Sequence, residues 1–410
     1  NREIIKKLAC WHVYKIPSGS ELILGNVYES SGARTYLAIA GGIRCPEYLG
    51  SRATFTLGNF GGHNGRCLRS GDVVRLNEDK LLPDLEQVRL PKSLVPNIFK
   101  SNDACSRAPL GIRVTYGPHG SPDFFTERDM EIFFSYDWEV HYNSNRTGVR
   151  LIGPKPEWAR KDGGEAGLHP SNLHDNAYAF GTVDFTGDMP VILGPDGPSL
   201  GGFVCPATVI TADLWKLGQL RAGDKIHFIP VSLSKATELE AAGHTSIKEF
   251  REIQVQVQPE ERSTPIMLAL SSCEYGDDIC YRKAGDKFLL IEYGQPEINF
   301  RLRLRVHALM EWLKSKPVEG VHEMTPGIRS LQLHYDSQIL SAKKLIDQLL
   351  VAEKSLSAQL DNMSVPSRTL FLPMSWDDHA CRSAVRKYDQ AVRKDAPWFP
   401  DNIEFIRRIN

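Results

Sequence analysis

The residues best suited to chemistry lie in two polar segments, residues 141–147 and 162–172. The first reads His-Tyr-Asn-Ser-Asn-Arg-Thr, and the second reads Asp-Gly-Gly-Glu-Ala-Gly-Leu-His-Pro-Ser-Asn. Amides, hydroxyls and charges of both signs at this density are typical of a binding site built on loops. The alternative is ordinary turn chemistry, because Asn, Ser, Gly and Asp also stabilise turns.

A third candidate loop, residues 194–202, contains Asp196 and Ser199 among glycines and prolines. Its backbone N–H groups and single carboxylate could approach a ligand closely, since glycine has no side chain to prevent it. The same glycines could equally well form a plain turn.

Several common chemistries are not indicated. The sequence has no GxxxxGK[ST] phosphate loop, no HExxH and no GxSxG, and its glycine pairs lack the GxGxxG spacing. His169 and His174 are five residues apart with no third ligand in register, so we expect no metal site.

Composition narrows the choice of partners. Forty-nine Lys and Arg residues oppose 50 Asp and Glu residues, for a formal net charge of -1, so no basic field is available for nucleic acid or an anionic membrane. The eight cysteines are scattered without a CxxC pair, which favours a reducing compartment. No apolar run approaches the roughly 20 residues that span a bilayer. We therefore predict a cytoplasmic protein.

The elements that would position these loops change in type along the chain. Short β-branched runs such as residues 35–40 and 225–229 predict strands joined by tight turns. Leu-Arg-Ser-Gly-Asp at 68–72 is echoed by Leu-Arg-Ala-Gly-Asp at 220–224, which indicates two related β domains joined by a linker at 81–109. A composition change at 238–265 predicts a second boundary, with an edge strand at 254–258.

Beyond that boundary the pattern is α plus β. Alternation predicts strands at 288–292, 318–324 and 330–335, and helical periodicity predicts helices at 297–314 and 341–360. A last unit opens with a strand at 369–373 and a helix after Ser375, whose hydroxyl would cap it.

Longer motifs resemble a known family. Residues 36–43, 115–125, 163–172 and 196–206 are similar to the allophanate hydrolase subunit 2 family, especially its urea carboxylase and urea amidolyase branch. Residues 281–286 and 326–336 resemble the partner subunit 1 family, fused in tandem.

The resemblance implies a fold that is mostly β with α+β: tandem cyclophilin-like β-barrel domains followed by a small α/β domain. We expect barrels at residues 1–110 and 111–262, the α/β domain at 263–365, and the start of a further barrel at 366–410. It also implies that the family's start lies upstream of Asn1 and that its last barrel continues past Asn410, so we expect a piece of a larger protein.

The implied function is the carboxyltransferase step of urea carboxylase, in which carboxyl passes from N-carboxybiotin to urea to give allophanate. No methionine precedes a lysine, so biotin would be attached to a carrier domain outside this chain. ATP and bicarbonate would be used by a biotin carboxylase domain, also outside it. The expected partners are urea, the carboxybiotin carrier and the biotin carboxylase domain, with an allophanate hydrolase as a further candidate.

Carboxyl transfer to urea needs donors for the urea carbonyl and acceptors for its amines, and this need suggests roles for individual residues. Asn145 and Asn172 would bind urea, Arg146 the carboxylate in transit, and Glu165 or Asp196 would accept from the urea amine. His169 would carry a proton. Two serines complete the expected substrate site, Ser171 and Ser199. The alternatives are purely structural roles: an ion pair for Arg146, a solvated acid for Glu165 and a turn residue for His169.

Two other functions stay open. One is a component of ATP-dependent 5-oxoprolinase, which shares these families without biotin. The other is a non-catalytic binding module of the kinase-inhibitor type.

Overall fold

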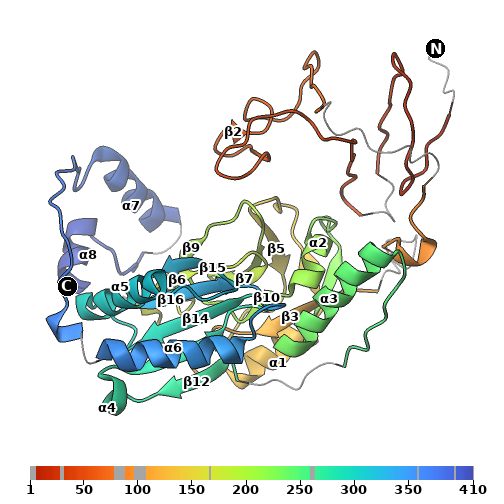
Figure 1. Ribbon diagram of the computed structural model, residues 1–410. Helices are drawn as coiled ribbons and strands as arrows, with labels where there is room; N and C mark the ends of the chain where they lie inside the picture. The colour runs from red at the N-terminus through yellow and green to blue at the C-terminus, as the bar shows by residue number, and fades with distance from the viewer. Residues whose placement is uncertain are drawn as a thin grey trace.

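The computed structural model describes residues 6–27, 32–77, 88–96, 108–165, 168–258, 264–357, 360–391 and 394–409. Two units with separate hydrophobic cores make up its centre, a β-barrel unit and a sheet unit (Figure 1). The described part of residues 6–77 runs above them mostly as loops, with one strand pair between β1 (Thr54–Phe55) and β2 (Phe60–Gly61).

The barrel unit is a closed barrel of seven strands in the order β10-β3-β11-β4-β5-β8-β7. β3 and β11 pair in parallel, and the other neighbours pair antiparallel. The strands are β3 (Leu110–Tyr116), β4 (Trp138–Val140), β5 (Gly148–Ile152), β7 (Thr182–Thr186), β8 (Met189–Leu193), β10 (Ala207–Val209) and β11 (Lys225–Pro230).

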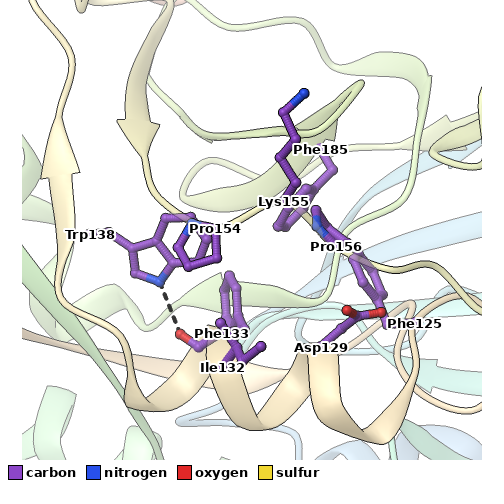
Figure 2. Close-up of a pocket in the computed structure, with 9 residues that line it drawn as sticks. All are labelled: Phe125, Asp129, Ile132, Phe133, Trp138, Pro154, Lys155, Pro156 and Phe185. Carbon is purple, nitrogen blue, oxygen red and sulfur yellow. Dashed lines mark hydrogen bonds between the residues drawn. The ribbon is translucent and has the colours of Figure 1, made fainter.

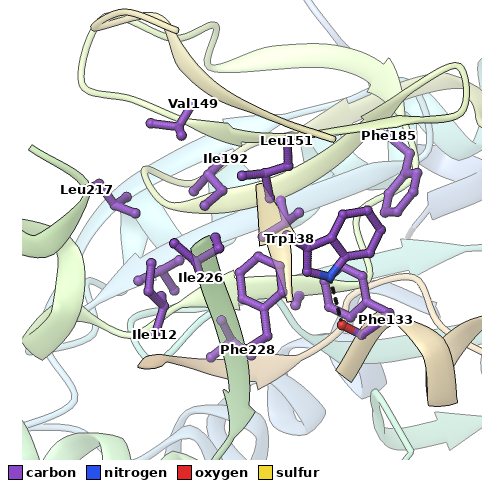
Figure 3. Close-up of a cluster of buried hydrophobic side chains, with 14 of the residues drawn as sticks. Ile112, Phe133, Trp138, Val149, Leu151, Phe185, Ile192, Leu217, Ile226 and Phe228 are labelled. Carbon is purple, nitrogen blue, oxygen red and sulfur yellow. Dashed lines mark hydrogen bonds between the residues drawn. The ribbon is translucent and has the colours of Figure 1, made fainter. Parts of the chain in front are cut away.

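Helix α1 (Glu127–Ser135) closes this core. Thr126 and Asp129 form a capping box at its start, in which each side chain accepts from the other residue's backbone N–H. The helix delivers Phe133 to the barrel interior, where its ring stacks on Phe228 at 4.8 Å between centroids. Figure 3 shows Phe133 beside Trp138, whose indole N–H donates to the Phe133 carbonyl. Burial of such aromatic rings is the main stabilising contribution expected in this unit.

Three further features complete the barrel unit. A separate ribbon joins β6 (Asn172–Ala177) to β9 (Leu200–Phe203) in antiparallel pairing. After β11, helix α3 (Leu233–Glu249) begins at Ser232, whose hydroxyl accepts from the Lys235 N–H. A short helix, α2 (Leu214–Leu217), lies between β10 and β11.

The sheet unit has five antiparallel strands in the order β12-β13-β14-β16-β15. Helices α5 and α6 lie over one face of it (Figure 1). The elements are β12 (Ile266–Leu270), α4 (Ser272–Tyr275), β13 (Ile279–Lys283), β14 (Phe288–Tyr293), α5 (Phe300–Ser315), β15 (Val321–Pro326), β16 (Ser330–Tyr335) and α6 (Ala342–Ser357).

The two faces of this sheet differ in chemistry because side chains alternate along a strand. Tyr281, Ile291 and Leu331 point into the core with the two helices. Arg282 and Glu292 are on the opposite face, which meets the barrel unit. One face of the sheet thus packs in an apolar core with α5 and α6, and the other face forms a polar junction with the barrel unit.

Other contacts across the junction are also polar. The Asp286 carboxylate accepts from the backbone N–H and the hydroxyl of Thr211, at 2.9 and 3.1 Å. Lys287 Nζ lies 2.7 Å from Glu240 Oε1 on α3. These bonds tie the loop between β13 and β14 to the barrel unit.

Several predictions are confirmed. The small α/β domain is present, with helices near 297–314 and 341–360 and strands near 288–292, 318–324 and 330–335. A strand is present at 225–229, within β11, and a helix follows Ser375 as α7 (His379–Ala391). One of the two expected barrels is present, at 110–230, while the described residues of 6–110 form no barrel.

Other predictions are wrong. Residues 35–40, 254–258 and 369–373 contain no strand. The composition change at 238–265 begins inside α3 and ends just before β12, and the domain boundary placed there stays a prediction. Asp378, and not Ser375, caps α7: its carboxylate accepts from the Cys381 N–H at 2.8 Å.

Three smaller points concern the rest of the chain. The described residues of 366–409 contain two helices, α7 and α8 (Asn402–Ile409), and the start of a further barrel stays a prediction. Most of the linker predicted at 81–109 falls outside the described residues. None of the helices that the structure describes is long and apolar enough to cross a membrane.

Candidate functional site

Arg146 and Asp196 form a bidentate ion pair. Arg146 Nε and Nη2 lie 2.7 and 2.8 Å from the two carboxylate oxygens of Asp196. The backbone also holds the two loops together, since the Asp196 N–H donates to the Arg146 carbonyl at 3.1 Å. This geometry uses two of the five N–H donors of Arg146 and both oxygens of Asp196, groups that the sequence interpretation assigned to a substrate.

His169 uses both ring nitrogens within the protein. Its Nδ1 accepts from the Ser171 N–H at 3.2 Å and lies 3.0 Å from the Ser171 hydroxyl oxygen. Its Nε2 lies 3.3 Å from Asp188 Oδ1, which also accepts from the indole N–H of Trp158 at 3.1 Å. An Nδ1 that accepts from a backbone N–H places the ring proton on Nε2, toward Asp188. This arrangement is that of a turn held by its own side chain.

Glu165 is largely buried, with a side chain 7% exposed. One oxygen accepts from the backbone N–H of His174, and the other lies 3.9 Å from Arg160 Nη2. Arg160 in turn donates to the carbonyls of Asn172 at 2.9 Å and Pro170 at 3.4 Å. Glu165 and Arg160 therefore act together as a brace for the segment that leads into β6.

The remaining predicted residues differ in the hydrogen bonds that they make within the protein. Asn145 Oδ1 accepts from the Thr147 N–H at 2.8 Å, which is a local turn bond. The Ser199 carbonyl accepts from the Tyr178 N–H at 2.9 Å. The side-chain amide of Asn172 makes no hydrogen bond with any residue that the structure describes. Of the predicted site residues, Asn172 thus keeps an amide that can still bind a ligand.

The predicted residues fall into two groups. Arg146, Asp196 and Asn145 lie on the loops beside β5 and β8, while Glu165, His169 and Asn172 lead into β6. The β6–β9 ribbon connects the groups, because Asn172 pairs with Phe203 at one end and Ala177 pairs with Leu200 at the other. Within the described ranges, no hydrogen bond or ion pair joins one group to the other.

A cluster that the sequence interpretation missed lies between the two units. The Glu292 carboxylate accepts from Arg282 Nε at 2.5 Å and from Arg329 Nη2 at 2.8 Å. Burial alone would raise the pKa of Glu292, but Arg329 and Arg282 lower it to about 2. The carboxylate is therefore charged at neutral pH.

His119 belongs to the same cluster and is 1% exposed. Its Nδ1 accepts from the Cys205 N–H at 2.9 Å, so a neutral ring carries its proton on Nε2. Burial lowers the pKa of His119 to about 3; the charge of Glu292 opposes this shift and that of Arg282 adds to it. In the sequence, His119 lies in a Gly-Pro-His-Gly motif at residues 117–120, to which the sequence analysis assigns no chemistry.

Asp175 was also missed, although it lies three residues after Asn172 on β6. Burial raises the pKa of its carboxyl, and a hydrogen bond from the Ile328 N–H opposes that shift. Nearby, the hydroxyl of Ser330 is buried without a hydrogen-bond partner among the described residues. Both groups are beside Gly327, where a Cβ would meet them. Polar groups of this kind at a junction between units are frequent in binding sites.

A shallow indentation near α1 carries no comparable chemistry. Figure 2 shows its aromatic and proline walls, with Asp129 and Lys155 as the charged members. The Asp129 carboxylate is already occupied by the N–H groups of Thr126, Glu157 and Trp158, at 2.7 to 3.1 Å. Among the described residues, no group of three or more His, Cys, Asp or Glu side chains is arranged to hold a metal ion.

Comparison with known families covers most of the chain. Residues 3–230 match the family described as carboxyltransferase domain, subdomain A and B, and residues 279–407 match carboxyltransferase domain, subdomain C and D.

Comparison with individual proteins gives the same picture. The urea amidolyase of Saccharomyces cerevisiae is 43% identical over 405 residues, which are 97% of this chain and 22% of that protein. The crystal structure of Kluyveromyces lactis urea carboxylase superposes with a TM-score of 0.75 at 41% identity, over 90% of this chain and 33% of that one. A 5-oxoprolinase subunit from Haemophilus influenzae is 28% identical over 246 residues, 60% of this chain and 70% of that protein. The chain thus spans about a fifth of the yeast relative.

Proposed function

Because this chain belongs to the carboxyltransferase-domain family, we propose that it is the carboxyltransferase part of a urea carboxylase, which transfers carboxyl from N-carboxybiotin to urea. The observation that best supports this proposal is the similarity to K. lactis urea carboxylase, with 41% sequence identity over 90% of this chain. The likeness to the H. influenzae 5-oxoprolinase protein extends over 60% of the chain at 28% identity. The urea assignment therefore accounts for both units, and the 5-oxoproline assignment for a shorter part.

The hydrogen-bonding groups of the site suit urea. Urea is planar, with one carbonyl that accepts and two amines that donate, so an amide and a carboxylate can hold it by opposed hydrogen bonds. Asn172 offers an amide not engaged by any described residue, and Asp175, three residues further along the same strand, offers a carboxylate with one oxygen bonded to the Ile328 N–H. We therefore centre the proposed urea site on the start of β6, with Asn172 as its main contact.

The other predicted residues are assigned supporting roles. The Arg146–Asp196 pair would fix the 194–199 loop, and Glu165 would hold the approach to β6 through Arg160. His169 and Ser171 would maintain the turn before Asn172. Asn145 and Ser199 stay predicted substrate contacts at the far end of the ribbon.

Biotin, ATP and bicarbonate enter this proposal from outside the chain. N-carboxybiotin, held on a carrier domain, would supply the carboxyl group. The residues at the start of β6 would orient urea toward it and exclude water, because correct alignment of two reactants accounts for much of the acceleration of such transfers. A biotin carboxylase domain would use ATP and bicarbonate to recharge the carrier, and allophanate would pass to a hydrolase.

The test is urea-dependent decarboxylation of added carboxybiotin, measured on the protein at its full natural length. Substitution Asn172→Ala should lower kcat/KM for urea by about a hundredfold, since a misplaced substrate loses much of its rate. Asn145→Ala and Asp196→Ala test the far end of the ribbon in the same assay. The exposed Asn362→Ala is the matched control and should keep full activity. Turnover that does not depend on urea, but responds to 5-oxoproline with ATP, would overturn the proposal.

A further inference from the structure

A buried ion pair of the sheet unit reaches across to the barrel unit. Arg282 is bonded to Glu292 through Nε, and its two other nitrogens point to the loop after β3. Nη1 lies 3.5 Å from the Pro118 carbonyl, and Nη2 lies 3.5 Å from Asp123 Oδ2. Since the side chain is 10% exposed, Arg282 is held at the junction and is not a mobile surface residue.

Phe124 receives this contact on the barrel side. The Arg282 guanidinium lies over its ring at 6.0 Å from the centroid, and the Arg160 guanidinium lies over the same ring at 5.5 Å. The His119 ring lies edge-to-face with the Phe124 ring, with 4.8 Å between the ring centroids. Guanidinium groups are attracted to the face of an aromatic ring, and more strongly where water is excluded. Phe124 thus links an arginine of each unit.

Arg160 carries the link on to the proposed urea site. It donates to the carbonyl of Asn172 at 2.9 Å and to that of Pro170 at 3.4 Å. Its other terminal nitrogen lies 3.9 Å from Glu165. The contacts therefore run without a break from Glu292, through Arg282, Phe124 and Arg160, to the backbone of Asn172.

We propose that Arg282 is a positioning residue, which fixes residues 160–165 and 168–172 from the sheet unit through Phe124 and Arg160. The importance of this segment for turnover rests on the proposed function, whereas its rigidity does not. Arg282 touches no reacting atom in this proposal. It fixes the position of the Asn172 backbone. Loss of Arg282 should therefore change the alignment of bound urea more than the affinity for urea.

Arg329 supplies a matched comparison. It shares the Glu292 carboxylate with Arg282, but its remaining bonds go to the carbonyls of Tyr293 and Gly294 within the sheet unit, both at 3.4 Å. Arg282→Gln and Arg329→Gln each remove one partner of Glu292. Of the two, Arg282→Gln alone removes the contact with Phe124.

The experiment is hydrogen–deuterium exchange of peptides covering residues 160–172, in the protein at its full natural length. Arg282→Gln and Phe124→Leu should speed exchange there by about tenfold, because local openings become easier when contacts are lost. Arg329→Gln, and Phe124→Tyr, which keeps the ring face, should leave it unchanged. Melting curves of all four variants identify any that fail to fold.

Kinetics provide a second readout. With urea, Arg282→Gln should lower kcat by about tenfold with a smaller change in KM, since alignment contributes to the rate of the reacting complex. Unchanged exchange in Arg282→Gln, or equal acceleration in Arg329→Gln, would overturn the positioning role. Faster exchange in a protein whose wild type shows no urea dependence would keep the positioning role and reject the proposed function.

Discussion

The carboxylate of Asp175 accepts a hydrogen bond of 3.0 Å from the backbone N–H of Ile328, and this bond ties β6 to the turn between β15 and β16. The approach is close at Gly327, where a Cβ would lie 2.8 Å from Asp175 Oδ2 and would also collide with the Ser330 hydroxyl. Little room is therefore left for a side chain at position 327.

The first prediction concerns this contact. Gly327→Ala should push the turn away from β6 and lower the free energy of unfolding by about 1–3 kcal/mol, as overpacking of buried sites does. Guanidinium chloride unfolding measures it. Gly243→Ala is the control: it lies within α3 with no atom in the way, and should raise stability by up to about 1 kcal/mol. Equal effects of both substitutions would contradict the close contact.

The second prediction concerns Asp184 on β7, which is 4% exposed and has one carboxylate oxygen without a partner among the described residues. Burial raises its pKa to about 7. The folded protein therefore keeps a proton that the unfolded chain, with a pKa of about 3.9, has lost. Stability from this group should fall as pH rises from about 4 to about 7, by a few kcal/mol at most. Asp184→Asn should remove that slope in unfolding measured at successive pH values.

The third prediction has the opposite sign. His119 has a pKa lowered to about 3 by burial, whereas an unfolded histidine has a pKa of about 6.5. Between these values the unfolded chain binds a proton that the folded protein rejects, so stability should rise with pH over that window. His119→Gln keeps an acceptor for the Cys205 N–H and should flatten the rise. A variant with the wild-type slope would show that another group is responsible.

The fourth prediction concerns a buried ion pair between α5 and α6. Arg305 Nη2 lies 2.7 Å from Glu353 Oε2, with both side chains at most 1% exposed. Glu353→Gln leaves the arginine with Asp277 as its remaining anionic partner, at 3.0 Å, and should cost about 3 kcal/mol. The double variant Arg305→Met with Glu353→Leu should lose less, because no uncompensated charge remains. Denaturant midpoints compare the two, and a larger loss in the double variant would refute the argument.

Local pattern predicted three of the five strands and both long helices of the sheet unit, and missed β12 and β13. The alternation at 330–335 gave β16 to the residue, and helical periodicity gave most of α6, because both elements pack one face on a core. The alternation at 254–258 misled. Val255 and Val257 are partly buried, but they pack against the small core formed by Ile210, Val231, Ala236 and Leu239, with no partner strand beside them in the described chain. A strand needs such a partner, which sequence periodicity cannot supply.

The candidate site was predicted in part for a similar reason. Asn172 and Glu165 stood out because polar residues gather in one loop. Glu292 is separated from Arg282 by 10 positions and from Arg329 by 37, and the three meet only through strand pairing and the turn after β15. The available signal was the presence of charged residues in otherwise apolar strands, at Arg282 and Glu292.

That same alternation restricts how the sheet can be assembled. A slip of β14 by one residue against β13 and β16 would turn Glu292 under the helices and send Ile291 to the barrel unit. The shifted carboxylate would lose both arginines and would lie among the aliphatic side chains below α5 and α6, where an unpaired charge is strongly disfavoured. One acidic residue in an apolar strand thus disfavours every odd-numbered slip of β14 relative to its two neighbouring strands.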